Sequence, residues 1–198
     1  MNLPTESILA NLTAFYDFRG KHVIHVGAGG GRLIGYAGLA GHVTAIDNDP
    51  LAVTALRDRI AERRDRDRFS ALAADFRAVA PRGDVVLFEF CLHLMDDPAA
   101  QLRHARTLAP EVIVLGHAPD SEWSWYAGEE SVVASSWAAV ARTSVRRRRC
   151  FELPRRFDDY RAVHEKFAAL GETSRQRIAQ LQSRHELVIA MPYCVVLI

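Results

Sequence analysis

The sequence predicts an α/β fold in which a mostly parallel sheet carries helices on both of its faces. Short apolar runs typical of buried strands alternate with segments of helical periodicity along residues 21–116. A glycine-rich turn at residues 27–31 follows the first apolar run, and the second run ends in Asp47. Alternating strands and helices favour parallel pairing, because each crossover helix returns the chain to the same end of the sheet.

The first elements follow from periodicity and from residues that begin helices. Thr5 opens an amphipathic helix whose apolar face carries Ile8, Leu12 and Phe15. The elements expected next are a strand at residues 23–26, a helix at 33–39 and a strand at 42–46.

A capped helix is expected after the second strand. Asn48 or Asp49 caps it, and Pro50 occupies its first turn. Its inward-facing residues are Val53, Leu56 and Ile60.

The remaining elements complete a single domain over residues 1–198. Strands are expected at residues 69–73, 84–90 and 111–115, with a helix at 99–108. Beyond Gly116 the regular alternation ends. The elements expected there are helical structure at 121–141, a strand at 145–153, one or two helices at 158–181 and a closing strand within 186–198.

The composition is that of an ordinary folded protein. Hydrophobic residues make up 49% of the chain and its formal charge is +1, so charge alone points to neither nucleic acid nor a membrane. The three cysteines, Cys91, Cys150 and Cys194, are odd in number and form no C-x-x-C pair. We therefore expect no disulfide framework, no zinc site and a reducing compartment.

The chain is expected to be soluble and cytoplasmic. Thr5 and Glu6 stand where a signal peptide would carry basic residues and then an apolar run. The most apolar segment, residues 187–198, is too short to span a bilayer and contains Pro192. We expect a monomer or homodimer with no membrane partner.

The glycine-rich turn carries the strongest functional signal. Gly27, Gly29 and Gly31 let the backbone turn tightly and approach a ligand with no Cβ in the way. The helix expected after the turn would direct free N–H groups at a negatively charged group. Asp47, at the end of the second strand, is placed to accept hydrogen bonds from ribose hydroxyls. These residues predict a site for a nucleotide-type cofactor.

The spacing of the glycines separates two such cofactors. A dinucleotide fingerprint has the form G-x-G-x-x-G, but here its third glycine position holds Arg32 and the glycine is Gly31. G-x-G-x-G followed by an acid resembles motif I of the class I S-adenosylmethionine-dependent methyltransferases. The chain departs from that pattern at His25, where the family often has an acid. The resemblance is carried by motifs over residues 20–116 and by architecture alone afterwards.

This resemblance implies a Rossmann-like, doubly wound sheet of seven strands, the last of them antiparallel. It also implies S-adenosylmethionine as the cofactor and S-adenosylhomocysteine as the product. The domain would divide into an N-terminal helix in residues 1–20, a cofactor-binding core in 21–116, and an acceptor-pocket segment with the terminal strands in 117–198.

The family's cofactor contacts carry over to strand ends of this sequence. The glycine loop would hold the methionine part, Asp47 the ribose, and Asp75 with Phe76 the adenine. The alternative for the last pair is a helix-capping acid followed by a core phenylalanine. The full set expected to contact the cofactor is Gly27, Ala28, Gly29, Gly31, Asp47, Asn48, Asp75, Phe76 and Glu89.

Two histidines at strand ends are the candidate catalytic bases. His93 stands in a stretch that resembles the Leu-His pair with a later Asp-Pro of small-molecule methyltransferases, where it is the base in some O-methyltransferases. A histidine near its unperturbed pKa can take a proton from a hydroxyl or amine as the methyl arrives. The alternative is that His93 only lines the pocket. His117, after the fifth strand, is the second candidate.

Aromatic residues follow the fifth strand. Trp123, Trp125 and Tyr126 would form a wall for a flat or cationic acceptor, or else be partly buried helix residues. Residues 146–149 form a run of arginines, which the alternating geometry of a strand would divide between two faces. That division favours a charged sheet edge over a nucleic-acid site.

Missing motifs narrow the reaction to in-line methylation of an O, N or S nucleophile on a small molecule. Neither the Asn/Asp-Pro-Pro-Tyr/Phe sequence of base and glutamine N-methyltransferases nor the Pro-Cys pair of cytosine C5 enzymes follows the fourth strand. Asp96 and Asp97 are interpreted as helix-capping acids and no metal site is predicted; the alternative is a divalent-metal O-methyltransferase that uses these two acids. The rival interpretations are a non-catalytic S-adenosylmethionine-binding protein, an NAD(P)-dependent oxidoreductase, and an RNA or protein methyltransferase.

Overall fold

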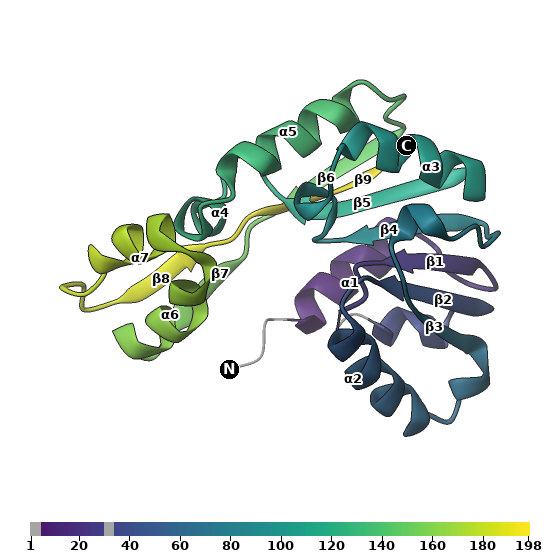
Figure 1. Cartoon of the computed structure of the whole chain (residues 1–198), viewed down its shortest axis with the longest axis horizontal. Coiled ribbons are helices and arrows are strands. Elements are labelled where there is room, and N and C mark those ends of the chain that lie inside the picture. The colour runs from purple at the N-terminus through teal and green to yellow at the C-terminus, as the bar shows by residue number, and fades with distance from the viewer. Residues whose placement is uncertain (1–4, 30–33) are drawn as a thin grey trace.

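A seven-stranded sheet forms the centre of the molecule in the computed structural model, which describes residues 5–29 and 34–198 (Figure 1). The strand order is β3-β2-β1-β4-β5-β9-β6, and β9 runs antiparallel between β5 and β6. This arrangement confirms the predicted doubly wound sheet with an antiparallel last strand. The strands are β1 (His22–Val26), β2 (His42–Asp47), β3 (Phe69–Ala73), β4 (Val85–Glu89), β5 (Glu111–His117), β6 (Arg147–Phe151) and β9 (Tyr193–Leu197).

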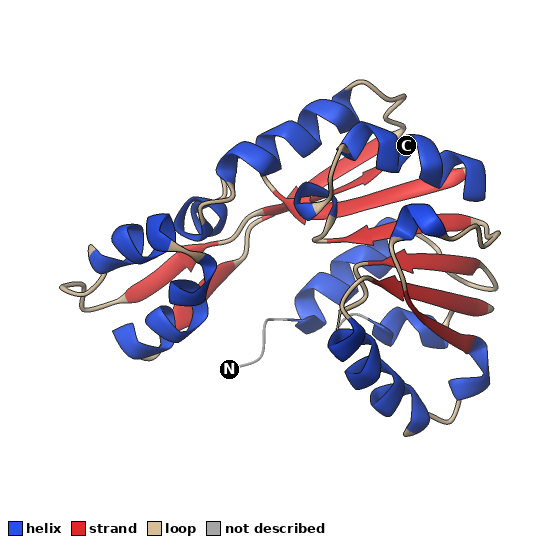
Figure 2. Ribbon diagram, viewed as in Figure 1, coloured by secondary structure: helices blue, strands red, loops and turns tan. Residues whose placement is uncertain are grey.

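Helices cover both faces of the sheet (Figure 2). One face packs against the first helix through a cluster that includes Leu12, Val23 and Val85. The other face packs against α3 and α5 through a separate cluster that includes Leu102 and Val140. The described helices are α1 (Thr5–Phe15), α2 (Pro50–Ala61), α3 (Pro98–Leu108), α4 (Glu122–Ala127), α5 (Glu130–Ala141), α6 (Tyr160–Phe167) and α7 (Glu172–Ala179). Among these elements no helix has the length and apolarity needed to cross a membrane.

Short 3₁₀ turns lie between several of the longer elements. They are η1 (Ile34–Gly38), η2 (Arg66–Arg68), η3 (Phe76–Ala78), η4 (Leu92–Leu94) and η5 (Ala168–Leu170). The prediction of an α-helix at residues 33–39 is wrong for its described residues, which form the 3₁₀ turn η1. Gly35 and Gly38 lie within this turn, and glycine is among the poorest formers of an α-helix.

The helix after β2 begins as its sequence predicts. Asp49 caps α2 by accepting a hydrogen bond from the Leu51 N–H, and Pro50 is the first helical residue. The predicted inward residues Val53, Leu56 and Ile60 are all buried.

The C-terminal half adds a second, two-stranded sheet that the sequence did not predict. β7 (Pro154–Phe157) pairs antiparallel with β8 (Leu187–Ala190), and this two-stranded sheet extends away from the main sheet with α6 and α7 beside it (Figure 1). The single closing strand expected within residues 186–198 is therefore two strands. They are separated at Pro192, because proline has no N–H to donate to a sheet ladder.

A disulfide joins Cys150 on β6 to Cys194 on β9, so the expectation that the cysteines form no disulfide is wrong. The two residues face each other in the antiparallel register of these strands. Their separation of 44 residues in the sequence forms no recognisable motif, and only the strand pairing brings them together.

The arginines of β6 divide between the two faces of the sheet. Arg147 lies 4.3 Å above the ring of Phe15 in α1, and Arg148 lies 5.5 Å above Trp137 in α5. Because Phe15 and Trp137 belong to the clusters on opposite faces, the run does not present one continuous basic surface.

Candidate cofactor and acceptor site

A cavity of about 420 Å³ lies at the carboxyl ends of β1 to β4. This is the edge at which open α/β sheets bind their ligands. The cavity brings together seven of the residues predicted to contact the cofactor, which are Gly27, Gly29, Asp47, Asn48, Asp75, Phe76 and Glu89. Of the other two, Ala28 packs in the core with Ala45 and Leu56, and Gly31 lies outside the described residues.

Gly27 is required by both its conformation and its neighbours. Its φ of +73° lies in the left-handed region, and a Cβ at this position would stand 2.5 Å from the Cβ of Cys91. The Gly27 N–H donates to the carbonyl of Ile46 at 2.9 Å. The start of the loop therefore packs directly against β2 and against Cys91, which follows β4, and no space is left for a side chain at position 27.

Asp47 accepts hydrogen bonds from two turns, one through each of its carboxylate oxygens. Oδ2 accepts the Gly29 N–H at 2.8 Å, and Oδ1 accepts the Asp49 N–H at 3.0 Å. The carboxylate thus connects the turn after β1 to the turn after β2, and it lies at the cavity wall.

Asp75 and Phe76 have the geometry of a cap followed by a buried ring. Asp75 Oδ1 accepts the Arg77 N–H at 2.8 Å and so caps η3. Phe76 is 2% exposed and packs edge-on against Phe88 and His104 at centroid distances of 5.3 and 4.9 Å. Both residues also border the cavity, so a contact with adenine stays a prediction for them.

Glu89 is held by a buried pair from β1 and η1. Its Oε2 lies 2.7 Å from Nε2 of His25, a residue with no exposed surface. The other ring nitrogen of His25, Nδ1, shares a hydrogen bond of 2.9 Å with the Tyr36 hydroxyl. Burial and the nearby Glu89 raise the pKa of Tyr36 well above its usual value. His25 therefore holds the Glu89 carboxylate of β4 at this edge of the sheet. In the methyltransferases that motif I resembles, the acid at this edge often stands on the first strand, at the position of His25.

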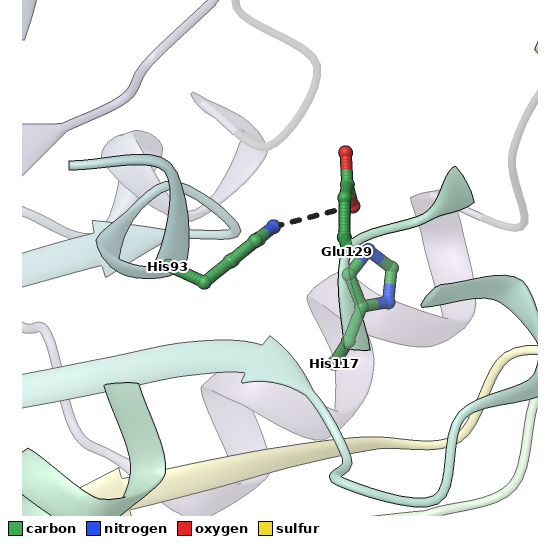
Figure 3. A group of neighbouring side chains, drawn as sticks. All are labelled: His93, His117 and Glu129. Carbon is green, nitrogen blue, oxygen red and sulfur yellow. Dashed lines mark ion pairs between the residues drawn. The ribbon is translucent and has the colours of Figure 1, made fainter. Parts of the chain in front are cut away.

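His93 and His117 come together beside the cavity but do not line it. Both are buried, and their ring centroids lie 5.6 Å apart. Nε2 of His93 is 3.5 Å from Oε2 of Glu129, and the His117 ring lies next to the same carboxylate (Figure 3). Burial, then His93 and Lys166, lower the pKa of His117 to about 3, so this imidazole is neutral near pH 7.

Two of the three aromatic residues after β5 are packed into the fold, and the third, Trp125, is exposed. Trp123 is 7% exposed and stacks near the His117 ring at a centroid distance of 6.5 Å, while Tyr126 is 2% exposed. Trp125 is 38% exposed, and the Arg177 guanidinium lies 4.7 Å above its ring. None of the three borders the 420 Å³ cavity, so a role in an acceptor pocket stays a prediction for them.

Sequence reasoning missed several residues that the fold brings to this region. Glu129 belongs to no recognised motif, and it reaches His93 because Gly128 ends α4 in the left-handed conformation and turns the chain. The other residues come soon after β4 in the sequence. Their position after a predicted strand end was the one feature from which a place at the cavity could have been predicted. Those that border the cavity are Phe90, Cys91, Leu94, Met95, Asp96 and Gln101.

Comparison with known proteins agrees with this arrangement. Residues 24–115 match the family model described as a methyltransferase domain. No curated protein matches the sequence.

Solved structures share the fold at low sequence identity. The YcgJ protein of Bacillus subtilis is 12% identical and superposes with a TM-score of 0.73, with 97% of each chain covered. A candidate methyltransferase of Bacillus halodurans is 14% identical, with a TM-score of 0.71 over 96% of this chain and 97% of that one. The magnesium protoporphyrin IX methyltransferase of Synechocystis, solved with bound S-adenosylmethionine, is 17% identical, with a TM-score of 0.57 over 98% of this chain and 77% of that one.

The family match spans the part of the chain that builds the strand-end cavity, and the sheet order agrees with it. Residues 24–115 match a methyltransferase domain, and the chain shares its fold with solved methyltransferases, one of them with bound S-adenosylmethionine.

Proposed function

We propose that this methyltransferase transfers the methyl group of S-adenosylmethionine to an O, N or S nucleophile of a small molecule. The observation that carries the proposal is the cavity of about 420 Å³ at the ends of β1 to β4, with two buried histidines immediately beside it. Residues 117–198 would shape the acceptor pocket.

The residues of the cavity fit the cofactor. At Gly27 the backbone of the loop is open to the cavity, and a Cβ there would clash with its neighbours. The Asp47 carboxylate lies at the cavity wall, at the carboxyl end of β2. In this proposal the loop holds the methionine part, Asp47 and Asn48 the ribose, and Asp75 the adenine amine. Glu89, held by His25, stands at the methionine end.

When bound, S-adenosylmethionine supplies a methyl group that its sulfonium has already made electrophilic. The protein then needs mainly to place a nucleophile in line with that methyl and to exclude water. His93 is the first candidate to take a proton from the acceptor, and His117 is the second and the weaker base, because burial lowers its pKa to about 3. The Glu129 carboxylate beside His93 would stabilise the imidazolium that forms.

A small acceptor is favoured over RNA or protein by the surface as well as by the missing motifs. Two arginines of β6, Arg147 and Arg148, are engaged with aromatic rings on opposite faces of the sheet. We also propose that the protein works in the cytoplasm as a monomer or homodimer.

The test of the reaction is a search for the acceptor. The protein is incubated with S-adenosylmethionine and with the dialysable, RNA and protein fractions of a cell extract, and S-adenosylhomocysteine is measured. We expect product with the dialysable fraction. Product with the RNA or protein fraction alone would overturn the small-molecule assignment. Cofactor binding without product in any fraction would favour a binding protein, and tight binding of NAD(P) instead would favour an oxidoreductase.

The cofactor assignment is tested by Asp47→Ala, with Asp49→Ala as the matched control. The loss of hydrogen bonds to a charged group costs about 1–3 kcal/mol, so the first variant should bind S-adenosylmethionine roughly 5- to 150-fold more weakly. Asp49 caps the neighbouring helix and does not border the cavity, so the control should bind with unchanged affinity. Calorimetry measures both. Equal affinities of the Asp47→Ala variant and the unmodified protein would show that this acid does not contact the cofactor.

A further inference from the structure

Three side chains from different elements meet beside the cofactor cavity. His93 comes from η4, His117 from the end of β5, and Glu129 from the junction of α4 and α5 (Figure 3). Each offers one ligand atom, and these atoms all lie within 4.8 Å of one another. We propose that the three residues bind one divalent transition-metal ion of the zinc class.

The donor atoms fit this class of metal. Two imidazole nitrogens and one carboxylate oxygen suit zinc and its transition-metal neighbours, whereas magnesium and calcium prefer oxygen alone. Two ligands of one tetrahedral zinc lie about 3.4 Å apart. His93 Nε2 and Glu129 Oε2 are already 3.5 Å apart, and the His117 ligand atom lies within 4.8 Å of the ligand atoms of both residues.

Hydrogen bonds to the backbone of Glu129 and of His117 fix the positions of these two residues. The Glu129 N–H donates to the Ser124 carbonyl at 2.8 Å, and the Trp137 indole donates to the His117 carbonyl at 2.6 Å. The His117 ring is packed by its neighbours Phe90 and Trp123. Its Nδ1 is buried with no hydrogen-bond partner in the described part of the chain.

The position of this cluster gives the metal a role in the reaction. Phe90, which packs against His117 at a centroid distance of 4.9 Å, and Cys91 and Leu94, which flank His93, all border the cavity. Three protein ligands leave a coordination position open, as in catalytic rather than structural zinc sites.

This role rests on the proposed function. The metal would bind the hydroxyl or thiol of the acceptor and favour its anionic form, whose proton leaves to water. The acceptor anion then forms a bond to the methyl carbon as the bond from carbon to the cofactor sulfur breaks. In this reaction His93 and His117 act as metal ligands, and water replaces them as the proton acceptor. The sequence predicted no metal at this position, and the inference departs from that prediction.

Metal binding is tested without the cofactor. Protein dialysed against a chelator is titrated with Zn²⁺ by calorimetry and with Co²⁺ by visible absorption. We expect one ion per chain, with the absorption bands of cobalt in a four- or five-coordinate site. His93→Ala and Glu129→Gln should each weaken binding by on the order of 100-fold while circular dichroism stays unchanged.

Two matched controls separate this site from adventitious binding. His22 and His42 form another close histidine pair, with ring centroids 4.9 Å apart, and Glu130 is a carboxylate next to Glu129 that pairs with Arg177. His42→Ala and Glu130→Gln should keep the ion. No binding, or binding that His42→Ala removes and His93→Ala preserves, would overturn the proposal and leave His93 and Glu129 as an ion pair.

Failure of this inference can be told apart from failure of the proposed function. Methyl transfer that persists in the chelated protein overturns the catalytic role of the metal and leaves the small-molecule methyltransferase intact. If Zn²⁺ binds but no dialysable acceptor is methylated, the proposed function fails while the metal site stands. Loss of transfer on chelation and its recovery with Zn²⁺ support both.

Discussion

Cys91 is a thiol that the fold keeps protonated. It is the one free cysteine, it borders the cofactor cavity, and its Sγ lies 3.3 Å from the Val26 carbonyl. Burial, and then the negative charge of Glu89, raise the pKa of this thiol well above its usual value. Since the thiolate is the reactive form, Cys91 should be a poor nucleophile at neutral pH.

We therefore predict slow alkylation of Cys91 in the native protein. At pH 8 its rate with iodoacetamide should be at least about tenfold below that of the unfolded chain, because a raised pKa leaves little thiolate. The rate should keep rising beyond pH 9, and bound S-adenosylmethionine should lower it further. Mass spectrometry of the alkylated peptide gives the rates, with Cys91→Ala as the blank. Rapid modification that levels off by pH 8 would contradict the raised pKa.

Individual side chains show how far sequence reasoning reached into the site. The glycines, Asp47 and Asp75 were found because motifs and strand ends mark their positions. The partners were not found, because Glu129 reaches His93 from 36 residues further along the chain through a contact that no local pattern specifies. The aromatic residues were named, but their burial depends on α6 and β7, whose packing the sequence did not predict.

The loop between β1 and η1 depends on one glycine for two separable reasons. A residue other than glycine at Gly27 would adopt a positive φ and would also place its Cβ 2.5 Å from that of Cys91. Gly20 has nearly the same φ, +68°, but no described heavy atom lies within 4 Å of a Cβ built there. The two positions therefore separate backbone strain from steric overlap.

Gly20→Ala should lower the free energy of unfolding by about 1–2 kcal/mol, the cost of left-handed backbone for alanine. Gly27→Ala should lose about 1–3 kcal/mol more, because its methyl group overlaps Cys91. Urea unfolding followed by circular dichroism measures both. Only Gly27→Ala should also lose affinity for S-adenosylmethionine. Equal destabilisation of the two variants would mean that the loop relaxes away from Cys91.

The strands and helices of the first half were predictable because each carries its own signal. Strand β3 was predicted with its observed bounds, and the cap of α2 was among the two residues named for it. The two-stranded sheet of β7 and β8 was missed because its strands are four residues each, alternate little between apolar and polar, and lie about 30 residues apart in the sequence. The 3₁₀ form of η1 also depends on packing, since a Cβ at Gly35 would lie 2.5 Å from Leu9 Cδ2.

The disulfide between Cys150 and Cys194 links β6 at the sheet edge to the strand beside β5. It closes a segment that contains β7, α6, α7 and β8, so it restricts the unfolded chain over residues 150–194. For a sequence separation of 44 residues, loop-closure entropy corresponds to about 4 kcal/mol, and measured disulfides commonly give about 2–4 kcal/mol.

Cys150→Ser should accordingly lower the free energy of unfolding by about 2–4 kcal/mol under oxidising conditions. Cys150 is exposed, so the new hydroxyl leaves no buried polar group without a partner. Dithiothreitol should lower the stability of the unmodified protein by a similar amount and leave the variant unchanged. A thiol assay on the unfolded chain checks the bond directly, with one thiol before reduction and three after. Three thiols before reduction would rule the bond out.

The cysteines also show a limit of counting rules for the whole chain. An odd number without a C-x-x-C pair indicates a reduced protein, yet two of the three face each other once β6 and β9 pair. The pairing register that decides this outcome depends on long-range contacts. The cytoplasmic location inferred from the same count stays a prediction.

The contact between His25 and Glu89 has a consequence for how such proteins are recognised. Where related methyltransferases often have an acid on the first strand, this chain has His25. The His25 ring lies 2.7 Å from the Glu89 carboxylate on the adjacent strand β4. A search pattern that demands the acid at its customary position would reject the chain, although negative charge stands at the same edge of the sheet. Replacing both residues together, His25→Glu with Glu89→His, would move the carboxylate back to the first strand. Distant relatives are therefore better recognised by a carboxylate at this edge of the sheet, which either of the neighbouring strands β1 and β4 can supply.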